Sequence, residues 1–386
     1  MSFIGHQSTH MIPVKRVDRW RVRTGYERVI AQYAGRNYAG VAEQDGKVTD
    51  IDPSTQLCTI KYKDGSIDKF KYGETYSEHE SVMTTHNLVL IVKVGQQVKK
   101  GDVITYNEHY FYRDPMTNQV DFCIGVKAKV ALLENDVSLE DATEISSRLS
   151  DAMSITPTNT RVVTLPADAI VHKCAQVGDE VTITDDLVVF ENTEGMDIEE
   201  SFNRVDDETL ALISDLNRKT PTAKFSGVIT KIEAYYGCPI SEMSPTLQPI
   251  VRKAAAEQNK LYKAVQGTTR EDDYAPSEPM PKYCKFKGVE FDSNTVMLIF
   301  YIQEHQAMNT GDKQVFGNQL KHTISKVMSR PMFTEEGEEI DAVFSAEAVS
   351  RRICMSPTLM GMSSQIMEKI EKNVLDIYFG DKKKKE

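Results

Sequence analysis

Short segments in which apolar and polar residues alternate constrain the fold of this chain more than any other feature. Three of them follow one another at residues 46–53, 57–62 and 68–72, with turn-forming residues between them. Alternation of this kind is typical of strands that bury one face, and the short connections indicate an antiparallel meander. The apolar run at 296–302 predicts a further strand, which leads into a turn. We therefore expect a fold that is mainly β with some α.

The pattern Val-Gly-x-x-Val occurs twice, at 94–98 and 177–181, and an aspartate follows each copy, at Asp102 and Asp185. Each copy predicts a strand, a glycine turn and a second strand. Lipoyl and biotinyl carrier domains share this pattern, but they need a lysine at a hairpin tip between small residues. Because neither copy places a lysine in that way, a barrel hairpin is the better interpretation.

Helical periodicity is confined to three segments. Residues 138–149 begin with the pattern of a capping box and carry their apolar residues on one face. Residues 249–266 start near a proline and stop at Gly267, and residues 363–378 repeat apolar side chains at helical spacing. The charged, proline-rich stretch 268–282 is typical of a linker or mobile loop.

Composition narrows the class of protein. A chain of 386 residues can form two or three packed domains, and 40% hydrophobic with 27% charged residues is ordinary for a globular protein. The longest apolar runs are too short to span a bilayer, and no basic region precedes an apolar one at the N-terminus. Six scattered cysteines argue against a zinc site and a disulfide framework. We expect a cytoplasmic protein without membrane association.

The net charge of −11 arises from one window, residues 179–208, which holds twelve acidic residues and one basic residue. The remainder of the chain is balanced. Basic residues gather in the first 36 positions and again at 311–330, and both clusters are compatible with a nucleic-acid channel. A solvated mixed surface explains each cluster at least as well.

The segment 311–327 contains two lysines, Lys313 and Lys321, in a run with glycine and asparagine. A tight turn after a strand can hold lysines in fixed positions. An ammonium group can bind a phosphate there and stabilise charge that develops during nucleotidyl transfer. Considered alone, two such lysines are more often ordinary surface residues.

Two further candidates carry complementary chemistry. The adjacent carboxylates of Glu140 and Asp141 suit the placement of Mg²⁺ and a nucleotide triphosphate, although acids in a first helical turn also stabilise the helix dipole. Arg352 is the third candidate, because a guanidinium fork matches phosphate oxygens. Arg351 or Arg352 could instead pair with the acids at 335–339.

Several segments resemble, in the same order along the chain, the β subunit of multisubunit DNA-dependent RNA polymerase. They are the Gly-Asp-Lys and Ile-Ser-Lys patterns within 311–326, the Glu-Asp-Ala pattern at 140–142, the Val-Ser-Arg pattern that leads to Arg352, the hairpin at 92–102 and the stretch 3–27. Their collinear order between about residues 3 and 361 makes the resemblance stronger than any single motif. Residues 317–319 and His322 depart from the family, which has Arg-His-Gly before the second lysine and a glycine after it.

The resemblance implies roles for the candidate residues. Lys313 and Lys321 would reach the RNA 3′ end and the phosphates of the nucleotide there. Arg352 would lie near the triphosphate. Glu140 and Asp141 would lie beside the second, nucleotide-borne magnesium.

The N-terminal stretch adds two candidates for nucleotide or RNA binding. Gln7 and His10 fall near family positions that face the transcript.

The resemblance also implies a double-psi β-barrel, a further small β-barrel or hairpin domain and a reduced flap. The expected domains are a hybrid-binding-like β domain at 1–125, the first part of the double-psi barrel at 126–160, a β hairpin and flap-like insertion with its linker at 161–285, the main part of the barrel at 286–362, and a C-terminal helix with a basic tail at 363–386.

The implied function is that of one subunit of a DNA-directed RNA polymerase, a nucleotidyltransferase that is not active alone. The Asp-x-Asp-x-Asp loop for the catalytic Mg²⁺ belongs to β′ in this family and does not occur in this sequence. Expected partners are β N-terminal-like and β′-like subunits in a hetero-oligomer, with template DNA, RNA transcript and nucleoside triphosphates. The segments that resemble the family correspond to the C-terminal half of β. A β subunit split in this way resembles those of the divergent polymerases of jumbo bacteriophages.

Two alternatives stay open. The first is a non-catalytic nucleic-acid-binding β-barrel protein derived from a polymerase subunit, against which the intact candidate residues weigh. The second is a carrier-domain enzyme component, which would need a covalently modified lysine.

Overall fold

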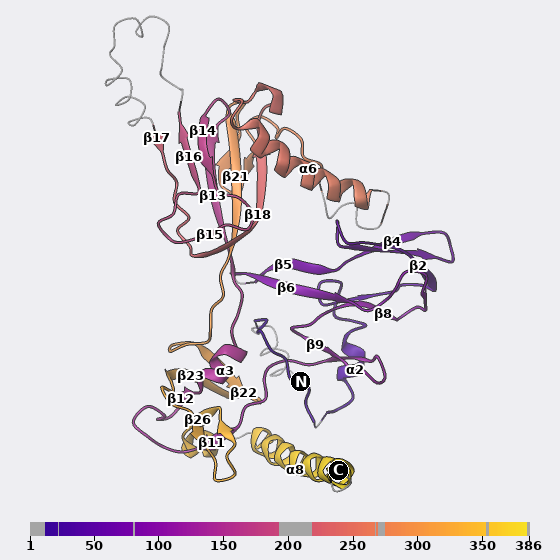
Figure 1. Cartoon of the computed structure of the whole chain (residues 1–386), viewed down its shortest axis with the longest axis vertical. Coiled ribbons are helices and arrows are strands. Elements are labelled where there is room, and N and C mark those ends of the chain that lie inside the picture. The colour runs from indigo at the N-terminus through magenta and orange to yellow at the C-terminus, as the bar shows by residue number, and fades with distance from the viewer. Residues whose placement is uncertain are drawn as a thin grey trace, which may run out of the picture.

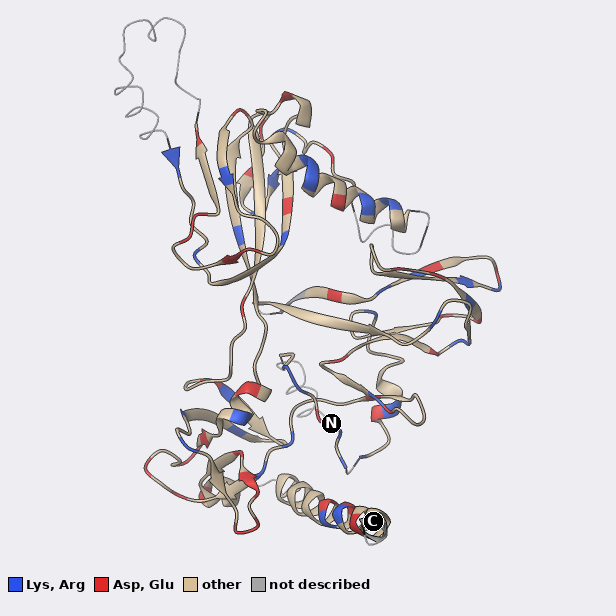
Figure 2. Ribbon diagram, in the orientation of Figure 1, with Lys and Arg blue, Asp and Glu red and all other residues tan. Residues whose placement is uncertain are grey.

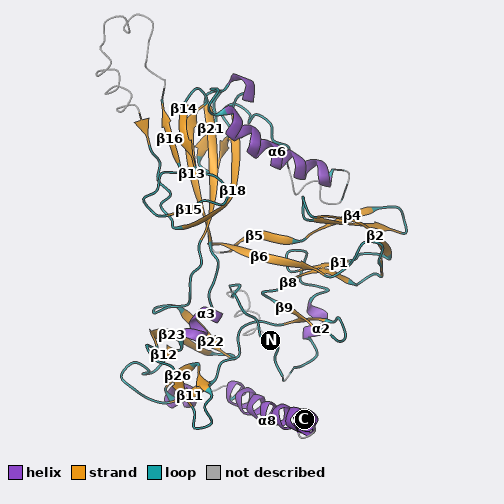
Figure 3. Cartoon of the chain, in the orientation of Figure 1, coloured by secondary structure: helices purple, strands orange, loops and turns teal. Residues whose placement is uncertain are grey.

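A computed structural model describes residues 12–21, 23–79, 82–192, 218–266, 268, 275–352 and 355–383. Strands dominate this part of the chain and gather in separate bodies, with the long helices α6 (Gln248–Val265) and α8 (Ser356–Lys383) beside them (Figures 1 and 3). The predicted mainly β fold with few helices is therefore confirmed. Within the same residues, no helix is both long and apolar enough to cross a membrane.

The first body contains the predicted meander, which is confirmed as antiparallel strands in the order β4-β3-β2-β7. A second sheet, in the order β1-β8-β6-β5, shares its core, since Val48, Ile60, Phe70 and Ile104 form one buried cluster. The elements of this body are α2 (Glu27–Ile30), β1 (Ala39–Val41), β2 (Gly46–Asp52), β3 (Leu57–Tyr62), β4 (Ile67–Lys71), β5 (Gly73–His79), β6 (Val82–Leu90), β7 (Gln97–Val98), β8 (Val103–Asn107), β9 (Phe111–Arg113) and β10 (Val120–Phe122).

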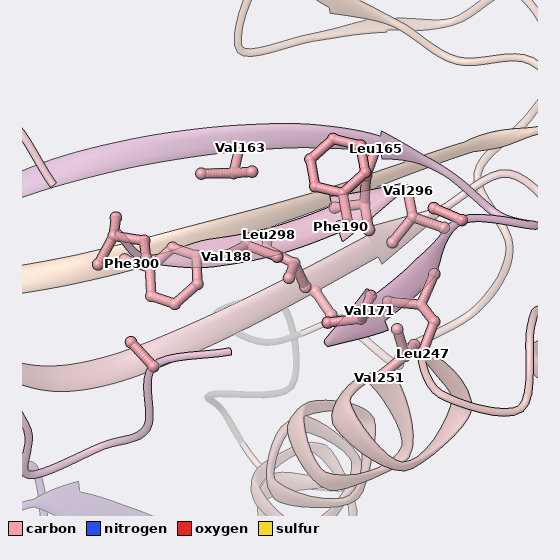
Figure 4. Close-up of a cluster of buried hydrophobic side chains, with 14 of the residues drawn as sticks. Val163, Leu165, Val171, Val188, Phe190, Leu247, Val251, Val296, Leu298 and Phe300 are labelled. Carbon is pink, nitrogen blue, oxygen red and sulfur yellow. The ribbon is translucent and has the colours of Figure 1, made fainter. Parts of the chain in front are cut away.

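The second body is built around β21 (Thr295–Gln303), which contains the apolar run predicted as a strand. It lies in a sheet of order β13-β21-β18-β15, and no residue of the run is more than 6% exposed. Leu247 and Val251, at the start of α6, share the core of this body with Val171 and Val296 (Figure 4). The other elements are β13 (Thr158–Pro166), β14 (Ile170–Cys174), β15 (Glu180–Val181), β16 (Val188–Glu191), β17 (Arg218–Lys219), β18 (Gly227–Tyr236), η2 (Ile240–Glu242) and α6 (Gln248–Val265), and the short pair β19 (Lys285–Phe286) and β20 (Val289–Glu290) follows.

The repeated Val-Gly-x-x-Val pattern forms two equivalent turns. Gly95 and Gly178 both have left-handed backbone, with φ of 85° and 98°. The carboxylate of Asp102 accepts a hydrogen bond from the amide of Lys99 at 2.8 Å, and Asp185 accepts one from Thr182 at 2.7 Å. The internal repeat is thus a repeated turn geometry, which each aspartate stabilises.

The third body is a five-stranded sheet in the order β11-β26-β12-β23-β22, in which distant parts of the chain meet. β12 runs parallel to β23 and antiparallel to β26, whereas β22 and β23 form a hairpin. Its strands and helices are β11 (Val130–Leu132), β12 (Ala142–Ile145), α3 (Ser147–Ala152), β22 (Lys313–Phe316), β23 (Leu320–Val327), β24 (Met332–Phe333), β25 (Glu339–Ile340), β26 (Ala342–Phe344) and α7 (Ala346–Ser350). Mixed pairing of this kind is compatible with a barrel, and closure into a double-psi barrel stays a prediction.

The predicted helix at 138–149 is wrong. Residues 142–145 form β12, and the helix starts only at Ser147, where the hydroxyl of Ser146 caps it by accepting a hydrogen bond from the amide of Leu149. The apolar spacing fits both structures, because Ile145 is buried as a strand residue and Leu149 as a helix residue. Pairing with β23 and β26 on both sides decides in favour of the strand.

The other two helices are confirmed. α6 matches the predicted 249–266, and α8 (Ser356–Lys383) includes the predicted 363–378 and extends beyond it at both ends. α8 lies beside the third body (Figure 1), and its Glu371 accepts a hydrogen bond at 2.7 Å from Arg21, in the N-terminal segment that precedes the first body. The part of the predicted 268–282 linker that is described, 268 and 275–282, includes a hydrogen bond from the amide of Met280 to Tyr236.

Candidate phosphate-binding site

The hairpin of β22 and β23 places the two candidate lysines on one face. Lys313 is opposite Thr323 and Val315 is opposite Lys321, so the side chains of all four point to the same side of the hairpin. The lysines are diagonal neighbours, a relation that separates the residues by about 7–8 Å. Both are exposed, and neither forms an ion pair with any residue that the structure describes.

The turn between these strands uses left-handed backbone at Gly317 and Gln319, each with φ of 62°. The base of the hairpin is fixed by Asp312, whose carboxylate accepts a hydrogen bond from the amide of Asn309 at 2.8 Å and whose carbonyl accepts one from Ile324 at 2.8 Å. The lysine backbones are therefore held at both ends, while their side chains stay available to a ligand.

The carboxylate candidates adjoin this hairpin. The carbonyl of Asp141, directly before β12, accepts a hydrogen bond from the amide of Thr323 at 2.9 Å. The Asp141 Oδ1 atom is 2.5 Å from Nη2 of Arg352, with 56% and 32% of the two side chains exposed. Arg352 thus contacts Asp141, and both residues lie at the end of the sheet where β23 begins.

Glu140 has a left-handed backbone with φ of 51°, which is uncommon for a residue with a side chain. Its side chain is 80% exposed and lies 3.9 Å from Arg351, which forms a shorter ion pair of 2.5 Å with Glu347. The capping-box interpretation of this segment is wrong, since a turn and then β12 follow.

The alternative partners considered for the arginines, the acids at 335–339, are also wrong, because Arg351 pairs with Glu347 and Arg352 with Asp141. Within that segment, Glu338 pairs with Lys129 and Glu339 with Arg148. Arg352 is therefore committed to the candidate site, with Asp141 as its partner.

Sequence reasoning missed the support beneath the lysine face. His322 follows Lys321 and points to the opposite, buried side, where its Nδ1 atom is 2.7 Å from the hydroxyl of Thr143 on β12. The ring packs against Phe316 and Phe344. Burial lowers the pKa of His322, while the nearby carboxylate of Asp141 acts in the opposite direction. Strand alternation around Lys321 was the signal that could have identified this inward position.

Two buried nitrogens under the hairpin have no hydrogen-bond partner among the described residues, Nε2 of His322 and Nε2 of Gln314. The two residues are register partners across β22 and β23. Such groups are rare in folded proteins, and an ordered water is the usual partner. The buried side of the site is thus polar as well as aromatic.

The residues present fit a metal ion only in part. The described chain contains no group of three or more His, Cys, Asp or Glu side chains that could hold an ion. Glu140 and Asp141 supply two adjacent carboxylates, and Arg352 occupies one oxygen of Asp141. Mg²⁺ often uses one or two carboxylates together with water and substrate phosphates, so this pair suits an ion that arrives with a nucleotide.

Gln7 and His10 lie outside the residues that the structure describes, as does the acidic stretch from 193 to 208. The described remainder of the acidic window has local roles. For example, the carboxylate of Asp179 accepts a hydrogen bond from the amide of Gln176 at 2.8 Å, and Glu191 lies 3.0 Å from His172.

Comparison with known proteins gives partial matches. No family model matches the chain. Curated relatives named DNA-directed RNA polymerase subunit beta are 29% identical over 144 residues in Desulfatibacillum aliphaticivorans, 30% over 149 in Geotalea daltonii and 28% over 144 in Citrifermentans bemidjiense. Each alignment covers 36% of this chain and 10% of the relative, so the chain spans about a tenth of the relatives it matches. A region of this chain is similar to the β subunit of DNA-directed RNA polymerase.

Proposed function

We propose that this chain acts as a β-type subunit of a DNA-directed RNA polymerase and that its third body binds the phosphates of the nucleotide and the RNA 3′ end. One observation carries the proposal: three distant segments bring two lysines, an arginine and two carboxylates to one sheet. These are the residue types that nucleotidyl transfer requires, and the similarity to polymerase β subunits supports the same conclusion.

The lysines would act on developing charge. In nucleotidyl transfer the 3′ oxygen of the RNA attacks the α-phosphorus of a nucleoside triphosphate, and pyrophosphate leaves. Negative charge then builds on the phosphate oxygens. Lys313 and Lys321, held on one face of a rigid hairpin, would stabilise that charge without first breaking an ion pair within the described chain.

Arg352 has a different starting state, because Asp141 already engages it at 2.5 Å. A triphosphate that binds Arg352 would displace Asp141, whose carboxylate would then be free to approach the Mg²⁺ that accompanies the nucleotide. Glu140, which is 80% exposed, would lie on the same side. The pair would exchange partners when substrate binds, which links triphosphate binding to metal placement.

The proposed enzyme needs partners. This chain offers no complete metal site in its described residues, so the primary Mg²⁺ would be held by a β′-like subunit. A β N-terminal-like subunit, template DNA, the transcript and nucleoside triphosphates complete the proposed hetero-oligomer.

Affinity purification of the chain from its native cells, followed by mass spectrometry and a promoter-independent RNA-synthesis assay, tests the proposal. We expect a stoichiometric complex that contains a subunit with the Asp-x-Asp-x-Asp motif and makes RNA only with Mg²⁺. A monomer, or a complex without that subunit and without RNA synthesis, would refute the proposal and favour a non-catalytic nucleic-acid-binding protein.

A further inference from the structure

The outer face of the β4-β3-β2-β7 sheet carries an unusual pair of lysines. Lys47 on β2 is the register partner of Lys61 on β3, and both side chains are exposed. Their neighbours along the strands, Val48 and Ile60, point into the core, so the two lysines point away from it. Lys69 on β4 lies on this outer face too, since its register partner is Thr59.

Like charges directly opposite each other in a sheet destabilise it. Lys47 and Lys61 have no acidic partner in an ion pair among the described residues. The nearest paired lysine, Lys63, differs in that Asp45 lies 2.6 Å from its Nζ atom. An anion over Lys47 and Lys61 would convert a repulsive pair into an attractive cluster.

α6 presents a second basic face. Its buried residues, Val251, Ala255 and Val265, define one side of the helix. The cations lie on the other side at helical spacing, and all are exposed and without an ion pair among the described residues. They are Arg252, Lys253, Lys260 and Lys263. At about 1.5 Å per residue, the row from 252 to 263 is roughly 16 Å long.

The two basic faces adjoin each other. Nζ of Lys69 donates a hydrogen bond to the carbonyl of Ala264 near the end of α6, and Nζ of Lys260 lies 3.5 Å from the carbonyl of Ser54 at the end of the β sheet. In Figure 1, α6 extends from the second body toward β4, and Figure 2 shows blue segments along it. We call this surface the basic corner, formed by Lys47, Lys61, Lys69, Arg252, Lys253, Lys260 and Lys263.

Few acids dilute the charge of the basic corner. Asp68 on β4 is buried and paired with Arg36, which leaves Asp50, Asp52 and Glu257 as the other acidic residues on its strands and helix, against seven cations. Asp52 is engaged by the hydroxyls of Ser54 and Thr55, which lower its pKa to about 2. A local charge of about +4 in a chain of net charge −11 favours a polyanion at this place.

We propose that the basic corner binds the phosphodiester backbone of a nucleic-acid strand without reading its bases. Ammonium and guanidinium groups are the groups that it offers, and these contact phosphates rather than specify sequence. A row of roughly 16 Å spans about five phosphates at 3.4 Å each along one strand of a duplex. The basic corner lies on the first and second bodies, away from the lysine hairpin of the third body (Figure 1). It does not depend on the function proposed for that hairpin.

Fluorescence anisotropy with the full-length chain tests this proposal. The probes are labelled 20-nucleotide single-stranded RNA, single-stranded DNA and duplex DNA of mixed sequence, at 50 and 200 mM salt. The variant Arg252→Gln/Lys260→Gln/Lys263→Gln removes three charges and keeps residues that favour a helix. With four phosphates engaged, the single-strand slope is about −2.8, so wild-type affinity should fall about 50-fold between these salts. The triple variant should lose about 2 units of that slope.

The matched control removes three exposed lysines of the second body that do not belong to the basic corner, on β14, on β17 and in the segment after β17, in the variant Lys173→Gln/Lys219→Gln/Lys224→Gln. It carries the same net charge as the test variant, so equal losses in the two variants would mean that only total charge matters. That result would overturn the proposal. The comparison of RNA with DNA identifies which polymer the surface favours, and binding of either supports it.

The variant Lys47→Gln/Lys61→Gln should change binding and stability in opposite directions. It should weaken nucleic-acid binding at least fivefold and also raise the melting temperature of the free chain, because the repulsive pair is removed. A docking surface for an acidic protein would instead bind poly-glutamate as tightly as RNA of equal charge. That outcome, or no binding of any nucleic acid at 50 mM salt, would overturn the proposal.

Discussion

Replacement of Lys321 by alanine should lower the elongation rate of the polymerase without lowering the stability of the chain. The side chain is exposed and has no ion pair among the described residues, so the free energy of unfolding should change by less than about 0.5 kcal/mol. Loss of one preorganised donor to transition-state charge costs about 2.7–4 kcal/mol, which corresponds to a 10²- to 10³-fold lower elongation rate. Lys313→Ala should behave in the same way. The hairpin geometry also predicts that the double variant loses less than the product of the two single losses, because diagonal neighbours would act on the same phosphates.

The assay is single-nucleotide extension on a preassembled template with RNA primer, using the purified complex, with melting of each isolated variant in parallel. Lys326→Ala is the control, since this lysine lies on the same strand but pairs with Glu144 at 3.7 Å, away from the turn. It should extend RNA within threefold of wild type. An assembled Lys321→Ala enzyme that extends RNA at the wild-type rate would refute the role assigned to the hairpin.

Three further predictions follow from the same site and from one buried histidine. Asp141→Asn should release Arg352 and lower the KM for nucleoside triphosphate while it raises the Mg²⁺ concentration needed for half-maximal rate, and an unchanged KM would contradict the partner exchange. Thr143→Val should lower the free energy of unfolding by about 1–3 kcal/mol, because it removes the hydroxyl that contacts Nδ1 of buried His322. The double variant Thr143→Val/His322→Leu should have a melting temperature close to that of wild type. Equal melting temperatures of the single and double variants would disprove the coupling. Burial lowers the pKa of His86 to about 4, so the unfolded chain takes up a proton first as pH falls below about 6.5, and stability should drop by about 2 kcal/mol between pH 7 and pH 5 through this residue alone. In His86→Gln the melting temperature should depend less on pH over this range, and an unchanged pH dependence would rule that explanation out.

Much of the fold was accessible from sequence because its strands bury one face. The meander of β2, β3 and β4 and the buried strand β21 follow directly from apolar alternation and from an uninterrupted apolar run. The segment 138–149 was predicted incorrectly for a physical reason. Ile145 and Leu149 are four residues apart and both buried, which satisfies a helical period, but β23 and β26 supply hydrogen bonds on both sides of residues 142–145. Long-range pairing of this kind leaves no local signal.

The candidate residues could be chosen from the sequence, but their geometry could not. The resemblance to polymerase β subunits singled out Lys313, Lys321 and Arg352, since charge and spacing alone fit ordinary surface residues as well. Nothing local indicated that Arg352 contacts Asp141 or that Glu140 adopts a left-handed backbone. These relations arise only when the sheet of the third body forms.

The parallel pairing of β12 with β23 has a consequence for biosynthesis. Thr143 and His322, which join these strands, are separated by 179 residues. At ribosomal rates of about 5–20 residues per second, β23 is synthesised about 10–35 s after β12. The whole second body is synthesised during this interval. During that time both edges of β12 lack the strands that later cover them, β23 and β26, and exposed edges of this kind promote aggregation. The sheets of the second body are complete by residue 303, whereas the sheet of the third body also needs β22, β23 and β26. A nascent chain that stalls before residue 320 should therefore depend on a chaperone that shields β12.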